Sequence, residues 1–136
     1  MQVINRFCAL AVIAASTIPA AAQDRGDLVV IGELVFSACY ECHLVGDAKL
    51  AKIGPHLNDL FGRKPGSVPD FQYSQAMIDF GQTHVWDEAT LTSYLRDTQS
   101  VVPGNKMKPF AFKKEAEIQA LLAYLATFDP DGMAPK

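Results

Sequence analysis

Apolar residues recur with the spacing of an α-helix at several places in the chain, and they nowhere alternate with polar residues over the period of two that a strand shows. The longest stripe predicts a helix over residues 113–128, which Asp129-Pro130 ends. A second stripe, Leu91, Tyr94 and Leu95, predicts a helix that Asp87 caps. The members of the longest stripe are Ile118, Leu121, Leu122, Leu125 and Phe128.

Two further helices are predicted upstream of these. One begins near Asp27 and runs into residues 39–43, with Gly32 and Phe36 four apart on one face. The other is short, because Ser74 can cap it and Gly81 can end it. Loops rich in Gly and Pro join the helices, with one helical turn over residues 57–61. The predicted fold class is all-α, with about five short helices and long loops.

The N-terminus has the composition of a secretory signal. Arg6 gives it a basic start, residues 7–18 are apolar, and Ala20-Ala21-Ala22 offers a cleavage site before Gln23. An uncleaved anchor is the alternative, although the apolar run is shorter than the roughly 20 residues of a membrane span. We predict a cleaved signal over residues 1–22 and a single domain over residues 23–136, secreted into the periplasm.

Residues 39–43 read Cys-Tyr-Glu-Cys-His, the attachment signature of a c-type haem. Each Cys sulfur can add to one vinyl group of the porphyrin, and the spacing places Cys39 and Cys42 on one turn of helix. His43 then lies under the ring and can bind iron through an imidazole nitrogen. The carbonyl of Pro55 is a candidate acceptor for the other ring nitrogen, unless Pro55 merely starts the next turn.

Two other chemistries use a Cys-x-x-Cys pair. A dithiol redox site usually opens a helix after a strand, and no strand-like run precedes Cys39. A zinc site needs two more ligands, and although His56 and His84 are available, no second Cys or His pair has zinc spacing. Haem attachment is therefore the favoured interpretation, and a haem would also fill part of the modest core that a domain of this size can build.

The other face of the haem iron also needs a ligand, and Met107 is the best candidate. It lies in a loop that Pro103-Gly104 shapes, far along the chain from His43. A thioether favours ferrous iron, raises the reduction potential and leaves no position for oxygen or peroxide. The alternatives to Met107 are Met77, in a short helix, or no methionine ligand at all. Met133 lies in the C-terminal tail, and we expect His56 and His84 to be exposed loop residues.

Several stretches resemble the class I c-type cytochromes, especially the bacterial soluble members close to mitochondrial cytochrome c. They cover nearly all of the mature chain and include Gly-Pro-His-Leu-Asn-Asp-Leu-Phe-Gly-Arg-Lys at 54–64 and Val-Pro-Gly-Asn-Lys-Met at 102–107. The resemblance implies the cytochrome c fold around one covalent haem c, attached to Cys39 and Cys42. It makes His43 and Met107 the axial ligands. The other matching stretches are Gly-Glu-Leu-Val-Phe at 32–36, Phe-Gln-Tyr-Ser at 71–74, and Trp86.

The resemblance also implies how the surroundings of the haem are built. Gly32 and Phe36 would pack on the last helix near Leu121 and Tyr124. Arg63, Tyr73 and Trp86 would hydrogen-bond the propionates, and Tyr94 would lie near the Met107 sulfur. The chain departs from the mitochondrial pattern at Met77, where an Asn is usual, at Asn105, where a Thr is common, and in a longer segment between residues 73 and 86.

The predicted function is one-electron transfer, without catalysis, between respiratory or photosynthetic complexes. The possible partners are a quinol-oxidising complex, a terminal oxidase, a photosynthetic reaction centre and a periplasmic dehydrogenase. A haem peroxidase or small-gas sensor with a labile sixth ligand is the alternative, and a thiol oxidoreductase is a third hypothesis. Each is distinguishable by the absorption spectrum or by thiol titration.

The net charge of −3 argues against nucleic acid as a partner. Lysines in the loops are nevertheless expected to rim the haem edge of a monomer and to attract acidic partner proteins, while the acids lie elsewhere, for example Asp24, Asp27, Asp87, Glu88 and Asp129. The lysines of the predicted rim are Lys49, Lys52, Lys64, Lys106, Lys108, Lys113 and Lys114.

Overall fold

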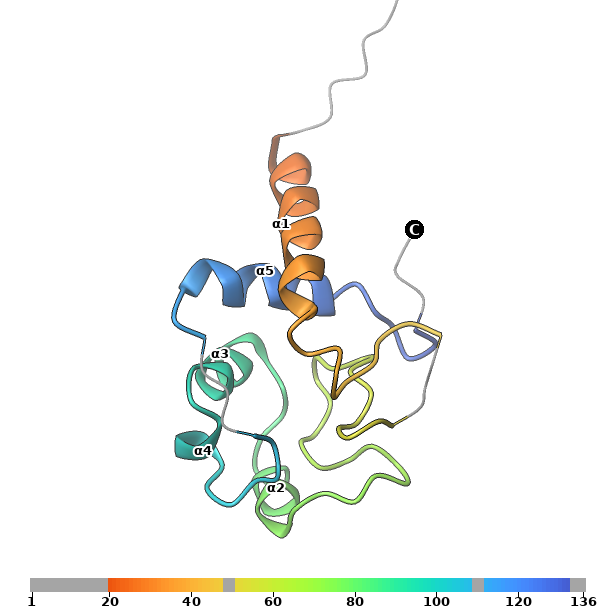
Figure 1. The fold of residues 1–136 in the computed structure, drawn as a ribbon, viewed down its shortest axis with the longest axis vertical. Coiled ribbons are helices and arrows are strands. Elements are labelled where there is room, and N and C mark those ends of the chain that lie inside the picture. Colours follow the sequence, from red (N-terminus) through yellow and green to blue (C-terminus); the bar gives the residue numbers. More distant parts are fainter. Residues whose placement is uncertain (1–19, 48–50, 109–111, 133–136) are drawn as a thin grey trace, which may run out of the picture.

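The structure, a computed structural model, describes residues 20–47, 51–108 and 112–132. These ranges contain five helices and no strand, which confirms the predicted all-α class (Figure 1). Most of the predicted signal, together with Lys49 and Met133, lies outside the described residues. Among the described residues, no helix combines the length and apolar character needed to cross a membrane. The helices are α1 (Ala20–Phe36), α2 (Gln75–Phe80), α3 (Glu88–Arg96), α4 (Thr98–Val101) and α5 (Glu115–Leu125).

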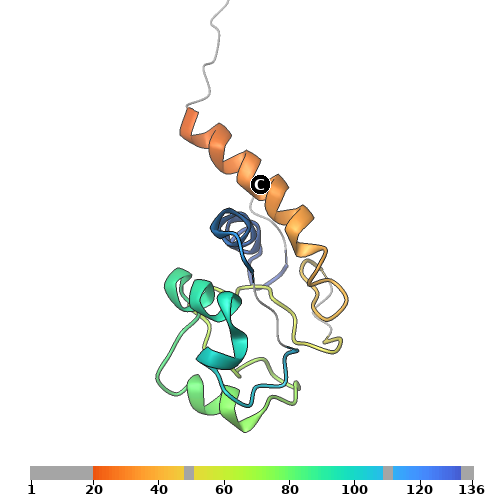
Figure 2. The ribbon, with the colours of Figure 1, turned by 60° about the vertical axis from the view of Figure 1, so that its left-hand side comes forward.

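Helix α5 is the centre of the arrangement. Both ribbon views place it between α1 on one side and the group of α2, α3 and α4 on the other (Figures 1 and 2). Helix α1 crosses α5 at Gly32, where an added Cβ would overlap the Ala120 carbonyl oxygen and lie 2.6 Å from the Tyr124 Cβ. The rings of Phe36 and Tyr124 are 5.5 Å apart beside this crossing. The predicted packing of Gly32 and Phe36 on the last helix is therefore confirmed.

The hydrophobic core fills the space between α5 and α3. Ile118 and Leu121 of α5 are 1 % exposed, and they belong to the same buried cluster as the Leu91, Tyr94 and Leu95 stripe of α3. This face of α5 follows from the helical spacing of its apolar residues. The core continues from α5 and α3 into a cavity that the long loops close.

Local capping chemistry explains the bounds of α2 and α3, which the sequence predicted correctly. The Ser74 side chain accepts a hydrogen bond from the Met77 N–H at 3.2 Å, and Asp87 accepts one from the Thr90 N–H at 2.7 Å. Gly81 ends α2 as predicted. Hydrogen bonds from the Thr90 backbone and side chain hold the pKa of the Asp87 carboxyl below its ordinary value, as expected at a helix N-terminus.

Helix α4 was not predicted, and its last residues fall in the loop predicted over residues 100–112. Asp97 caps α4, and its carboxylate accepts from the Gln99 N–H at 3.2 Å and the Ser100 N–H at 3.0 Å. A helix of four residues is too short to show an apolar period, so only this cap could have revealed it.

Helix α1 differs from its prediction at both ends. It begins at Ala20 instead of near Asp27, and it ends at Phe36, before the Cys-x-x-Cys-His segment. Ser37 contributes to the early end, because its hydroxyl donates to the Leu34 carbonyl at 2.7 Å, where it competes with the helical ladder. The predicted helical turn over residues 57–61 is also wrong, since these residues form non-helical turns and Asp59 has a φ of 50°.

Candidate haem site

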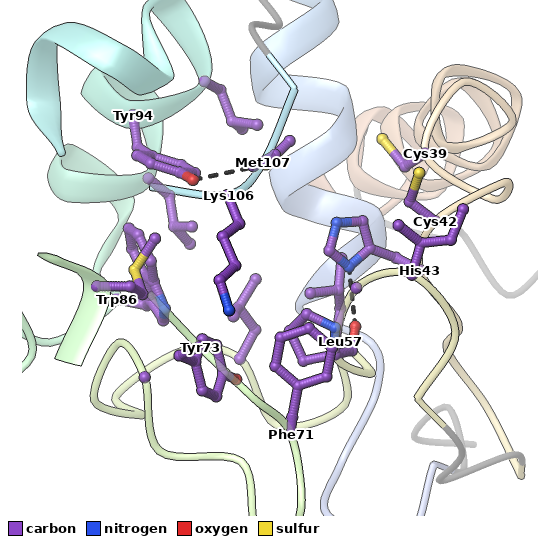
Figure 3. A pocket seen from close by; sticks show the side chains of 18 of the residues that line it. Cys39, Cys42, His43, Leu57, Phe71, Tyr73, Trp86, Tyr94, Lys106 and Met107 are labelled. Atoms are coloured by element: carbon purple, nitrogen blue, oxygen red, sulfur yellow. Dashed lines mark hydrogen bonds between the residues drawn. The ribbon is translucent and has the colours of Figure 1, made fainter. Parts of the chain in front are cut away.

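Loops and helices between Phe36 and Leu125 line one large apolar cavity (Figure 3). Its wall includes Leu121 and Leu125 of α5, Leu91 and Leu95 of α3, and Met77 of α2. All eight residues that the sequence analysis assigned to the haem line this same cavity. They are Cys39, Cys42, His43, Arg63, Tyr73, Trp86, Tyr94 and Met107.

Cys39 and Cys42 lie side by side at one wall of the cavity and are both half-buried (Figure 3). The segment that carries them is wound into consecutive turns, in which the N–H groups of Cys42 and His43 both donate to the Cys39 carbonyl, at 3.0 and 2.9 Å. Burial, and then the neighbouring Cys42, raise the pKa of the Cys39 thiol to about 11. A dithiol redox site needs a lowered thiol pKa, so this environment does not suit one.

Gly54 and Pro55, in the loop that follows the Cys-x-x-Cys-His segment, hold the ring of His43. Its Nδ1 lies 2.8 Å from the Pro55 carbonyl oxygen, as predicted. A carbonyl only accepts, so Nδ1 carries the proton and Nε2 keeps a free lone pair. Burial lowers the pKa of His43 against the smaller opposing effect of the Pro55 hydrogen bond, which favours the neutral imidazole that a metal requires.

Gly54 has a role at this site that the sequence analysis did not find. A Cβ on Gly54 would lie 2.7 Å from Nδ1 and 2.9 Å from Nε2 of the His43 ring. The Gly54 backbone therefore lies flat against the imidazole, and a side chain there would push the ring away. The Gly-Pro pair of the sequence was the available signal, since glycine is the residue that allows such a close approach.

Met107 enters the cavity from a different wall than His43 (Figure 3). The Tyr94 hydroxyl donates toward its sulfur at 3.5 Å, so the predicted proximity of these two side chains is confirmed. The same hydroxyl is 3.3 Å from the Asn105 Oδ1, which also accepts from the Met107 N–H at 2.9 Å. Burial raises the pKa of Tyr94 to about 12, so its hydroxyl remains a neutral donor.

Arg63, Tyr73 and Trp86 form a third part of the wall. The Arg63 guanidinium donates to the carbonyls of Asn58, at 2.6 Å, and His56, at 3.1 Å. Backbone hydrogen bonds keep Arg63 and Trp86 together, because the Trp86 N–H donates to the Arg63 carbonyl at 2.9 Å. Burial is the main cause that lowers the pKa of Arg63 and raises that of Tyr73. The wall thus presents a half-buried cation that suits an anionic group.

The remaining candidates have mixed outcomes. His84 is exposed, as predicted, but His56 is partly buried, contrary to the expectation. Neither histidine lines the cavity. Met77, the alternative ligand, is 8 % exposed and lies in the cavity wall among the core residues.

The residues present fit a covalently bound haem. The cavity is apolar, two thiols with the correct spacing lie at its wall, a pre-oriented neutral imidazole enters it, and a thioether enters from elsewhere. A small all-α protein with two thiols, an imidazole and a thioether around one apolar cavity belongs to the class of c-type haem proteins.

Comparison with known proteins gives the family. The model of the family named Cytochrome c matches residues 29–129, and the chain belongs to that family. It is 46 % identical over 81 % of its length to cytochrome c2 of Afifella marina, covering 90 % of that protein. It is 42 % identical over 90 % of its length to cytochrome c2 of Blastochloris viridis, covering 92 % of that protein.

A solved structure agrees with these sequence relatives. Cytochrome cH from Methylobacterium extorquens superposes with a TM-score of 0.67 and 30 % identity, covering 73 % of this chain and 97 % of that one. The predicted family resemblance and the cytochrome c fold are thereby confirmed, and the family carries one covalently bound haem c.

Proposed function

We propose that this chain transfers single electrons through a haem c that Cys39 and Cys42 attach and that His43 and Met107 ligate. As a member of the cytochrome c family the protein is an electron carrier and not an enzyme. The bound haem supplies a reversible one-electron couple. The observation that carries the ligand assignment is the His43 ring, which the Pro55 carbonyl and the Gly54 backbone hold with Nε2 unprotonated in the cavity.

The chain's own residues would keep this couple fast and selective. His43 is already oriented, so its geometry changes little when an electron arrives or leaves. A Met107 sulfur bound to the iron would favour the reduced form and would leave no open position for oxygen or peroxide. The apolar wall from α3 and α5 excludes water from the rest of the site. These features favour electron transfer over a peroxidase or gas sensor.

Arg63, Tyr73 and Trp86 are proposed to hold the haem propionates. The hydrogen bonds of Arg63 support this role. The guanidinium has five N–H donors, and the carbonyls of Asn58 and His56 use only some of them. Its position in the wall allows the remaining donors to meet a carboxylate, and burial strengthens a charge-assisted hydrogen bond.

The absorption spectrum tests the ligand assignment directly. The oxidised holoprotein should show the weak far-red band of iron–methionine bonding at neutral pH, and Met107→Ala should abolish it while a matched Met77→Leu variant keeps it. Colour that acid acetone extracts would contradict covalent attachment. A wild-type spectrum without the far-red band would instead favour the peroxidase or sensor alternative.

Docking is proposed to use lysines at the cavity mouth. Lys106 and Lys108 are exposed and also line the cavity, and Lys52 lies 4.0 Å from the centre of the exposed Tyr40 ring. Lys114 fits the rim less well, since its ammonium pairs with Glu117 at 3.0 Å. The partner proteins would be acidic redox complexes that oxidise quinol, reduce oxygen, perform photosynthesis or oxidise a periplasmic substrate.

The dependence of the electron-transfer rate on ionic strength distinguishes this electrostatic docking from nonspecific collision. Steering by opposite charge raises association rates by about tenfold or more at low salt, and the effect falls as salt screens the charges. Lys106→Glu should therefore slow electron transfer to an acidic partner and remove most of its salt dependence. Arg25→Glu makes the same charge change on exposed α1 and should have little effect. A rate that salt does not alter would refute the docking surface.

We also propose that the chain is secreted to the periplasm and cleaved before Gln23. Cleavage there would remove the first residues of α1 and leave its crossing with α5 at Gly32 intact. N-terminal sequencing of the secreted protein tests this, and a mature protein that retains residues 7–18 would support the uncleaved anchor instead.

A further inference from the structure

Asn105 does not line the cavity, yet its side chain ties the Met107 loop to α4: Oδ1 accepts from the Met107 N–H and the Tyr94 hydroxyl, and Nδ2 donates to the carbonyls of Thr98 and Val102. We propose that Asn105 is a positioning residue for electron transfer. Its amide fixes the backbone of the Met107 loop and holds the Tyr94 hydroxyl beside the Met107 sulfur. This inference rests on the proposed function, in which Met107 is an iron ligand.

The amide of Asn105 is buried, at 8 % exposure, and makes four hydrogen bonds. Its Nδ2 donates to the carbonyls of Thr98 and Val102, both at 2.8 Å. Its Oδ1 accepts from the Met107 N–H at 2.9 Å and the Tyr94 hydroxyl at 3.3 Å. The orientation of the amide is fixed chemically, since carbonyls only accept and a backbone N–H only donates.

These bonds tie the Met107 loop to a rigid element. Thr98 begins α4 and Val102 is its C-cap, so the two carbonyls anchor the Asn105 side chain to that helix. The opposite end of the same amide holds the Met107 backbone. Moving Met107 away from the cavity would therefore break a part-buried hydrogen bond and leave the Oδ1 of the buried Asn105 with one partner fewer, which costs free energy where access of water is limited.

The Tyr94 hydroxyl adds a second link that reaches the sulfur itself. It has one proton and two acceptors within reach, the Asn105 Oδ1 at 3.3 Å and the Met107 Sδ at 3.5 Å. Asn105 thus sets where the hydroxyl lies and how strongly it donates to the thioether. A shorter side chain at position 105 would release both the loop and the hydroxyl.

Gln99 provides a comparison within the same loop. Its Nε2 donates to the carbonyls of Asn105 and Met107 at 3.3 and 3.2 Å, and its Oε1 accepts from the Gly104 N–H at 3.3 Å. These bonds are longer than most of those of Asn105, and they reach only backbone atoms. Gln99 should therefore contribute less to the position of the sulfur.

The experiment measures how readily an external ligand displaces Met107. Imidazole is titrated into the oxidised holoprotein, and the loss of the far-red iron–methionine band gives its dissociation constant. Because imidazole binds when the Met107 loop opens, Asn105→Ala should tighten imidazole binding about tenfold, which corresponds to about 1.4 kcal/mol of lost restraint. Gln99→Ala should tighten it about threefold, in line with its longer hydrogen bonds.

Asn58→Ala is the matched control for loss of a buried amide. Asn58 is 0 % exposed, and its side chain makes two hydrogen bonds with the Gly46 backbone, of 2.9 and 2.8 Å, in a loop that does not carry Met107. The Asn58 group that Arg63 uses is the backbone carbonyl, which alanine keeps. Its removal should lower the unfolding midpoint while imidazole affinity stays within about twofold of wild type. A residue with a merely structural role would behave in this way.

The outcomes are distinct. An imidazole affinity of Asn105→Ala within about twofold of wild type, with the band present in both, overturns the role of Asn105. If Asn105→Ala does not accumulate as holoprotein, Asn105→Thr decides, because its hydroxyl can replace only part of the amide. Tightening of about threefold supports the proposal, and no tightening overturns it. Absence of the band from wild type refutes the ligation of iron by Met107 itself.

Discussion

Replacement of Gly32 by alanine tests how α1 and α5 are held together. An added Cβ at position 32 would overlap the Ala120 carbonyl oxygen and lie 2.7 Å from its carbonyl carbon. Backbone atoms of a buried helix cannot move aside as a flexible side chain can. The two helices would have to separate, and the Phe36–Tyr124 ring contact beside them would loosen.

The size of the effect follows from two opposing contributions. Forcing a methyl group into a packed contact costs about 1–3 kcal/mol, and the backbone obstacle places this case in the upper part of that range. Alanine in a helix interior is more favourable than glycine by about 1 kcal/mol. Gly32→Ala should therefore lower the free energy of unfolding by about 1–2 kcal/mol.

Gly26 supplies a matched control on the same helix. Nothing lies within 4 Å of a Cβ at position 26, so Gly26→Ala should raise stability by up to about 1 kcal/mol. Both variants are compared by denaturant unfolding of the holoprotein, followed by circular dichroism and by the fluorescence of Trp86, the single tryptophan. The reasoning is refuted if Gly32→Ala is as stable as Gly26→Ala, because then no close helix contact constrains position 32.

Three further predictions concern the site and its support. Gly54→Ala should displace the His43 ring from the Pro55 carbonyl and lower the yield of holoprotein, measured by haem absorbance per polypeptide; an unchanged yield and spectrum would contradict the close contact. Ile118→Ala, at a side chain 1 % exposed, should cost about 2–5 kcal/mol in denaturant unfolding, and Ile118→Val only about 0.5–1.5 kcal/mol; equal losses would argue against tight packing there. The pKa of Asp97 is lowered chiefly by its Ser100 hydrogen bonds, so its stabilising effect is present above the ordinary pKa of 3.8 and disappears as pH falls through the lowered pKa. The stability difference between wild type and Asp97→Ala should shrink over that acid range, and a constant difference would refute the assignment.

Local signals in the sequence were sufficient for the middle helices. Ser74 and Asp87 each cap a helix by a hydrogen bond to an N–H three residues on, and this chemistry depends only on neighbouring residues. The C-terminal helix was also predicted, because its apolar stripe repeats over several turns, although it spans Glu115–Leu125 and the predicted stripe member Phe128 lies beyond its end. Helix α4 and both ends of α1 were not predicted, since a four-residue helix has no apolar period and the hydrogen bond from the Ser37 hydroxyl to the Leu34 carbonyl leaves no mark in the hydrophobic pattern.

The individual chemistry of the site was also readable from the sequence. The Cys-x-x-Cys-His spacing gave the cofactor class, and the resemblance to class I c-type cytochromes supplied the other cavity residues. Asn105 was visible only as a departure from the family pattern. Its role became visible only in the structure, where the Tyr94 hydroxyl and the Met107 N–H both donate to its side-chain Oδ1.

By itself, then, the order of residues determined where the two middle helices start and stop and which segment carries the haem-attachment spacing, because caps, apolar periods and this spacing depend on near neighbours in the chain. The tertiary structure decided which distant groups meet. Gly54 lies against the ring of His43, and the Tyr94 hydroxyl reaches the sulfur of Met107, because packing on α5 brings their loops to one cavity. Such contacts join residues with no local interaction, so only burial in a shared core fixes them.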